Sequence, residues 1–173
     1  MNNIKYLFKY GYTKDQLTRF TYLDLSNRKI RIIEVKLFQR CPNLTQVNLS
    51  NNKLTTLDVN TFKRLTKLIK LDLMNNRIEA IDVELFHAAL SSHLKILFLN
   101  GNRLTRIEEN TFEKLTQLTI LDLSCNNIER IDAKLLENCT NLRGLYLHNN
   151  KIKEISKESF NRLNVIEIIT IYN

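Results

Sequence analysis

A fixed spacing of apolar residues and asparagine runs through most of this sequence and constrains its fold more than any other feature. Five copies of the pattern begin at residues 44, 68, 94, 118 and 142. The first of these consists of Leu44, Val47, Leu49, Asn52 and Leu54. An earlier copy begins at Phe20, with Arg28 at the asparagine position, and a partial copy begins at Ile166. The copies follow one another at steps of 24 residues, with one step of 26, so each is one unit of a repetitive fold.

A single unit of this kind cannot bury its own apolar side, so neighbouring units must stack and share one core. Within a unit, the alternation of Leu71, Asp72 and Leu73 is typical of a short strand. The two leucines then point inward and the residue between them points outward. The sequence therefore predicts a short strand at the same place in every copy.

Each copy continues with a second pair of apolar residues: Leu57 with Phe62, Ile81 with Phe86, Ile107 with Phe112, Ile131 with Leu136, and Ile155 with Phe160. With these positions included, residues 20–173 resemble the leucine-rich repeat family in its typical 24-residue subclass. The resemblance implies an α/β fold, a right-handed leucine-rich repeat solenoid or horseshoe. Its parallel β-sheet would lie on the concave face, with short helices or turns on the convex face. It also implies about six repeats plus a final strand.

The composition indicates that asparagine makes the turns. The chain has 29 leucines and 22 asparagines, but only three glycines and one proline, the usual turn residues. At the ninth position of each copy the chain leaves the strand, and a buried carboxamide there can bond backbone groups that the sheet leaves unpaired. Stacking predicts a structural ladder of Asn52, Asn76, Asn102, Asn126 and Asn150. We interpret Arg28 as an irregularity of the first unit, which has no preceding unit to match.

In each copy an acidic or hydroxyl residue comes directly after the apolar residue at the position of Leu57. These residues are Glu34, Asp58, Asp82, Glu108, Asp132 and Ser156. Such side chains cap helix N-termini and interact favourably with the helix dipole. Because residues 59–65 and their equivalents have helical apolar spacing, we expect these residues to be helix starts. A row of metal ligands is disfavoured, since successive carboxylates belong to different units and lack a chelating loop.

The two ends of the chain carry different signals. Residues 1–19 predict an N-terminal helical cap, because Thr13 and Gln16 form a capping-box pattern and Gly11 suits the end of an earlier helix. Residues 20–173 are the repeat domain. Residues 165–171 predict an apolar final strand whose edge can pair with another chain. Self-association through this C-terminal edge strand is one expectation, and further chain that covers the edge is the other.

The sequence holds no pattern typical of an enzyme or of a cofactor site. It lacks metal-ligand spacing, a phosphate-binding glycine loop and a nucleophile motif. Cys41 and Cys139 fall at apolar core positions, and no cysteine clusters flank the repeats. No stretch is apolar for long enough to span a membrane, and residues 1–10 lack the features of a secretory signal. We therefore expect a non-enzymatic, intracellular (cytoplasmic) protein whose thiols stay reduced.

The outward columns of the concave face are where function is expected. Their third, fifth and seventh positions are mainly polar in the first three copies, whereas later copies bring apolar and aromatic residues together. Exposed aromatic groups of this kind are typical of protein-binding surfaces. We predict a partner-binding face formed by Met74, Ile96, Phe98, Ile120, Asp122, Tyr146, His148, Ile168 and Tyr172. For Ile96 and Ile120 the alternative is that they only stabilise their strands.

A row of positive charge occupies the tenth position of the copies. The chain as a whole has 26 basic and 18 acidic residues, a net charge of +8. The basic rim consists of Lys29, Lys53, Arg77, Arg103 and Lys151. One interpretation is a solvated edge that keeps the protein soluble, and the other is an electrostatic strip for an acidic partner. Nucleic acid is disfavoured as a partner, because the aromatic residues do not alternate with this rim.

The sequence as a whole favours a protein-protein interaction module. We expect it to bind a protein partner on its concave face, as an intracellular adaptor or effector without cofactors. The ectodomain of a receptor-type or secreted leucine-rich repeat protein is an alternative. A nucleic-acid-associated protein that uses the basic rim is a further alternative.

Overall fold

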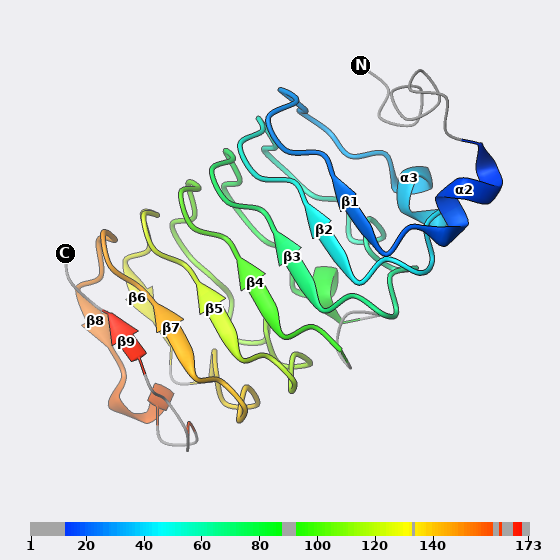
Figure 1. Cartoon of the computed structure of the whole chain (residues 1–173). Coiled ribbons are helices and arrows are strands. Elements are labelled where there is room, and N and C mark those ends of the chain that lie inside the picture. Colours follow the sequence, from blue (N-terminus) through cyan, green and yellow to red (C-terminus); the bar gives the residue numbers. More distant parts are fainter. Residues whose placement is uncertain (1–12, 88–92, 133, 161–162, 164–167, 171–173) are drawn as a thin grey trace.

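The repeats stack side by side as successive turns of a solenoid, with their strands along one face (Figure 1). The structure is a computed structural model that describes residues 13–87, 93–132, 134–160, 163 and 168–170. One parallel sheet contains β1 (Tyr22–Asp24), β2 (Gln46–Asn48), β3 (Lys70–Asp72), β4 (Ile96–Phe98), β5 (Ile120–Asp122), β7 (Gly144–Tyr146) and β9 (Ile168–Thr170), in that spatial order. A separate parallel pair consists of β6 (Arg130–Ile131) and β8 (Glu154–Ile155).

Every strand of the seven-stranded sheet covers the third to fifth positions of its repeat. Equal positions pair across the sheet, so Leu71 lies opposite Val47 on one side and Leu97 on the other. The 26-residue step before β4 leaves this register unchanged, and the two additional residues must lie outside the strand. The predicted α/β solenoid with a parallel sheet is therefore confirmed.

The core is one continuous row of apolar side chains behind the sheet. Leu71, Leu73, Leu97 and Leu99 have no exposed surface, and their equivalents in the other repeats are also buried. A second buried row contains Phe38, Phe62, Phe86 and Phe112. Ring centroids are 5.5 Å apart between Phe38 and Phe62, and 5.9 Å apart between Phe86 and Phe112. Because apolar burial contributes about 25 cal/mol per Å², each repeat stabilises the next by covering its open side.

The ladder asparagines join consecutive repeats. Asn102 Oδ1 accepts the Ile78 N–H at 3.0 Å, and its Nδ2 donates to the carbonyls of Leu73 at 3.0 Å and Leu99 at 2.9 Å. Ile78 and Leu73 belong to the preceding repeat, and Leu99 belongs to the same repeat. Equivalent bonds are made by Asn52, Asn76, Asn126 and Asn150. All five are between 7% and 9% exposed, so their carboxamides replace water for buried backbone groups.

A second column at the same turn has a left-handed backbone, which the sequence analysis did not identify. Its members have φ between 52° and 67° and are Asn27, Asn51, Asn75, Gly101, Cys125 and Asn149. Asparagine enters this region more readily than other residues with a side chain. The excess of asparagine thus has two structural causes, an inner column that bonds the backbone and an outer column that lets it turn.

The convex side contains fewer helices than the acidic row predicts. In the described residues it has helix α3 (Val35–Gln39) and the 3₁₀ helices η1 (Val83–Phe86) and η2 (Lys157–Phe160). Residues 59–65 form turns instead, with bonds from Thr61 N to Asp58 O and from Leu65 N to Phe62 O, so the predicted helix there is wrong. Helices this short are marginal without strong packing, and the repeat leaves room for only one or two turns.

The acidic row still caps some of these turns. Asp82 Oδ1 accepts the Glu84 N–H at 2.9 Å at the start of η1, and Asp58 Oδ1 accepts the Asn60 N–H at 2.8 Å. Glu34 precedes α3 but makes no side-chain cap bond. Asp and Glu are therefore not equivalent at this position, because the shorter side chain reaches the backbone two residues ahead.

The N-terminal end of the solenoid begins with helix α2 (Lys14–Arg19). The predicted capping box is present: Thr13 Oγ1 accepts the Gln16 N–H, and Gln16 Oε1 accepts the Thr13 N–H. Leu17 is 1% exposed and joins the core, so α2 covers the first repeat. Gly11 lies outside the described residues. None of the described helices has the length and apolar character needed to cross a membrane.

Candidate protein-binding face

The described residues of the predicted binding face lie on four neighbouring strands of the concave sheet and on positions just after a strand. Ile96 and Phe98 belong to β4, Ile120 and Asp122 to β5, and Tyr146 to β7. All five side chains are partly buried, as are Met74 and His148. Ile168 begins β9, and Tyr172 lies outside the described residues.

The fifth concave position has a structural role in four of the repeats. Asp72 Oδ1 accepts the Met74 N–H at 3.0 Å, and Asp122 Oδ1 accepts the Ser124 N–H at 2.9 Å and its hydroxyl at 2.6 Å. Asp24 and Asn48 make the same bond to the backbone two residues ahead. A short side chain with an acceptor oxygen stabilises the turn in this way.

Phe98 and Tyr146 occupy the same position without such an acceptor. Their strands flank β5, so Phe98 and Tyr146 lie on either side of Asp122 in the register. The Lys70 Nζ lies 5.0 Å from the centroid of the Phe98 ring, a cation-π distance. The Tyr146 ring packs over Gly144, where an added Cβ would lie 3.3 Å from a ring carbon. Two repeats therefore have a partly exposed aromatic ring at the position where four others have a side chain that bonds the turn.

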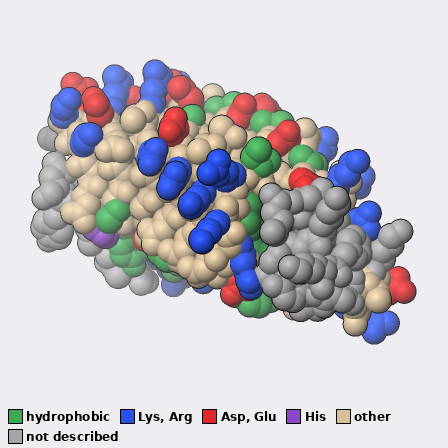
Figure 2. Space-filling model, turned by 90° about the horizontal axis from the view of Figure 1, so that it is seen from above, with side chains coloured by type: hydrophobic (Ala, Val, Ile, Leu, Met, Phe, Trp, Pro, Cys, Tyr) green, Lys and Arg blue, Asp and Glu red, His purple; other side chains and the backbone are tan. Residues whose placement is uncertain are grey.

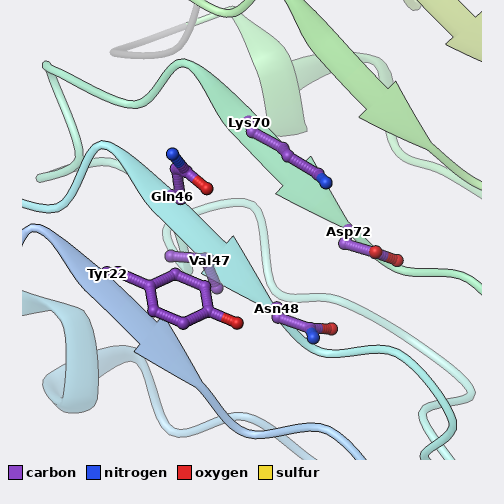
Figure 3. Close-up of a pocket in the computed structure, with 6 residues that line it drawn as sticks. All are labelled: Tyr22, Gln46, Val47, Asn48, Lys70 and Asp72. Atoms are coloured by element: carbon purple, nitrogen blue, oxygen red, sulfur yellow. The ribbon is translucent and has the colours of Figure 1, made fainter.

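A pocket of about 320 Å³ lies at the other end of the concave face (Figure 3). Its lining residues come from β1, β2 and β3 and are Tyr22, Gln46, Val47, Asn48, Lys70 and Asp72. The repeat register places five of these residues in the outward columns, but it contains no signal that they form a pocket. Its walls depend on how the Tyr22 and Lys70 side chains lie, which the repeat spacing does not determine.

The carboxylates of the fifth column differ in their electrostatics. Burial raises the pKa of Asp72. The bond from the Met74 N–H and the charge of Lys70 lower this pKa, and the charges of Asp24 and Asp122 raise it, so that the net shift is upward. The pKa of Asp24 is lowered instead, mainly by the Ser26 N–H that it accepts. Negative charge is therefore less favourable at Asp72 than at Asp24.

The basic rim lies beside the asparagine turns. Lys29, Arg77, Arg103 and Lys151 are exposed, and Lys53 is partly buried. Lys and Arg side chains gather near the middle of the surface seen in Figure 2. Arg103 Nη1 lies 3.8 Å from Glu79 Oε1, an exposed pair that contributes little to stability.

The thiols and histidines show no arrangement typical of catalysis within the described residues. Cys41 and Cys139 are buried in the core as predicted, and burial raises their pKa to about 11 and about 12. Thiols with so high a pKa remain protonated and are poor nucleophiles. In the part of the chain that the structure describes, no three His, Cys, Asp or Glu side chains are placed to share a metal ion.

A family model described as "Leucine rich repeat" matches residues 18–78, 66–124 and 116–172. The chain therefore belongs to the leucine-rich repeat family, whose domains are commonly protein-interaction modules and typically non-enzymatic. No curated protein matches the sequence significantly.

Two solved structures show the same fold. One is an internalin from Listeria monocytogenes, with a TM-score of 0.68 and 28% identity over 83% of this chain and 39% of that chain. The other is the APL1 leucine-rich repeat domain, with a TM-score of 0.72 and 24% identity over 83% of this chain and 36% of that chain. The chain thus spans less than two fifths of the length of either structure.

Proposed function

We propose that this chain is a non-enzymatic interaction module that binds a partner protein on its concave face, as an intracellular adaptor or effector. The observation that carries this proposal is the pair Phe98 and Tyr146. Both occupy a concave position that holds a turn-stabilising Asp or Asn in four other repeats. The intracellular part of the proposal rests on the sequence, in which no cysteine clusters flank the repeats.

The surroundings of the two rings favour a binding role. Ile96 and Ile120 lie in register one strand apart, next to Phe98 and Asp122, so partly exposed apolar surface extends over β4 and β5. Binding energy at protein interfaces concentrates on aromatic residues that become fully buried on contact. The rings are already held by Lys70 and Gly144, so ordering them costs little entropy when a partner binds.

A purely structural role is the alternative, and it is stronger for Tyr146 than for Phe98. The Tyr146 ring covers the backbone at Gly144, where no side chain protects the strand. Phe98 has no comparable glycine to cover, since Ile96 and Ile120 occupy the adjacent positions. Partner binding and folding must therefore be measured separately.

The experiment uses the full chain, immobilised, to capture partners from cells that naturally express it, followed by calorimetry with the purified partner. Changing Phe98 and Tyr146 together to alanine is expected to weaken binding at least about tenfold. Ile32→Ala is the control, because Ile32 is 70% exposed and lies outside the concave columns. Undiminished binding by a folded double variant would show that the aromatic pair does not form the binding face.

A further inference from the structure

The pocket at the N-terminal end of the concave face has a gap between two walls. Tyr22 on β1 and Lys70 on β3 pair in register with Gln46, which lies between them on β2. Because β1 and β3 are two strand spacings apart, their backbones lie about 10 Å from each other. The Tyr22 hydroxyl donates to Asp24 Oδ2 at 3.2 Å, which fixes the end of the ring. Figure 3 shows this ring beside Asn48, with Asp72 on the far side of the pocket.

Several polar groups around this gap are not used by the fold. Asp72 Oδ1 accepts the Met74 N–H, but its Oδ2 accepts no hydrogen bond within the described residues. The Gln46 carboxamide likewise makes no bond to any described residue. Asn48, another lining residue, uses its Oδ1 to accept the Ser50 N–H. The pocket therefore offers a half-buried carboxylate oxygen and an amide oxygen as acceptors.

The electrostatics of the pocket favour a positive guest. Lys70 is the cation among the lining residues, but its ammonium lies over the Phe98 ring, and among the described residues it makes no ion pair with Asp72. Burial, followed by the charges of Asp24 and Asp122, raises the pKa of the Asp72 carboxyl, and the bond from the Met74 N–H and the charge of Lys70 lower it without cancelling that rise. A bound cation would offset this cost, whereas a bound anion would increase it.

We propose that this pocket binds the guanidinium group of an arginine side chain in the segment of the partner protein that docks on the concave face. The inference rests on the proposed function and extends it by naming the chemistry of one contact. Arginine fits better than lysine because its planar group carries five N–H donors, so it can bond Asp72 Oδ2 and still present a flat face to the opposite wall. The same flat group can also stack on the Tyr22 ring, which is 52% exposed.

The test is an NMR titration of the isotope-labelled full chain at about 0.05 M salt, where exposed charges are only partly screened. The probes are three capped tripeptides, glycine-X-glycine, in which X is arginine, lysine or citrulline. The arginine peptide is expected to shift the backbone amides of β1, β2 and β3 with saturation. A single side chain binds weakly, so we expect a dissociation constant on the order of 1 mM.

Two variants test the assigned contacts, and one serves as a matched control. Asp72→Asn is expected to weaken binding of the arginine peptide about tenfold, and Tyr22→Leu about fivefold. Asp72→Asn should fold, because Asn48 already makes the equivalent backbone bond in the neighbouring repeat. Asp58→Asn removes a carboxylate with a similar backbone bond outside the concave columns and should leave binding unchanged.

The outcomes separate this inference from the proposed function. Saturating shifts that require arginine and Asp72 support it. Equal shifts with citrulline or lysine, no saturation, or full binding by Asp72→Asn would overturn it. None of these results bears on whether a partner needs Phe98 and Tyr146, since neither ring lines the pocket. Conversely, loss of partner binding in the double alanine variant with an intact arginine titration would leave the pocket assignment in place.

Discussion

The inner and concave faces of the seven-stranded sheet follow different rules although they share the same strands. On the inner side, the buried leucines and the asparagine ladder repeat almost without change. On the concave side, the fifth position changes between acidic, amide and aromatic residues: Asp24, Asn48, Asp72, Phe98, Asp122 and Tyr146. The backbone register is the same for all of them.

The repeated contacts that stabilise the fold lie on the inner face, whereas the proposed binding residues lie on the opposite face of the same sheet. An inner residue contacts two repeats, so any change there is felt in both. A concave residue such as Phe98 can replace an aspartate without moving its strand, because Asp72 and Asp122 still pair with it in register. Single substitutions on the two faces should therefore have different consequences, and the following three predictions test this from the largest effect to the smallest.

The largest effect is expected for Asn102→Leu on the inner face. The variant leaves the buried Ile78 N–H without its acceptor in the middle of the solenoid. It also removes one of the two amide donors to each of the Leu73 and Leu99 carbonyls, which still accept from Asn76 and Asn126. Unsatisfied buried groups of this kind cost about 1 to 3 kcal/mol. Urea denaturation should show a lower midpoint, with Asn110→Leu, at an exposed position, as the control. An unchanged midpoint and slope would mean that the ladder does not stabilise the fold.

The sequence determined the inner face far better than the concave face. Leucine and asparagine spacing gave every strand of the main sheet, because inward positions are constrained by contact with two neighbours. The helical spacing of residues 59–65 was misleading, since apolar residues three and four apart also suit consecutive turns. The pocket could not be predicted, because it depends on the conformations of Tyr22 and Lys70 rather than on the register.

An intermediate effect, dependent on pH, is expected for Asp72→Asn on the concave face. The pKa of Asp72 in the folded protein is raised above its usual value of 3.8, chiefly by burial. The folded state thus holds this proton more tightly than the unfolded state, and stability falls as pH rises from 3.8 through the folded pKa. Asparagine keeps the backbone bond without the charge.

Urea midpoints at two pH values check this prediction. Asp72→Asn should be more stable than the parent at pH 7, and the difference should close near pH 3, where the carboxyl is protonated in both states. The same variant is expected to lose the arginine peptide, so the carboxylate would lower stability while supporting recognition. If the variant were less stable than the parent at pH 7, or if its urea midpoint differed from the parent's by the same amount at both pH values, the charge of Asp72 would not be what lowers stability.

The smallest effect on stability is expected for Phe98→Asn. The change removes the Lys70 contact and some apolar packing, but it supplies the acceptor that Asn48 uses for the backbone two residues ahead. Both contributions are about 1 kcal/mol and opposite in sign, so the free energy of unfolding from urea denaturation should change by no more than about 0.5 kcal/mol. Partner binding should fall nevertheless, because the exposed ring is gone. If Phe98→Asn were as destabilising as Asn102→Leu, the concave face would share the structural role of the inner face, and the division between the two would not hold.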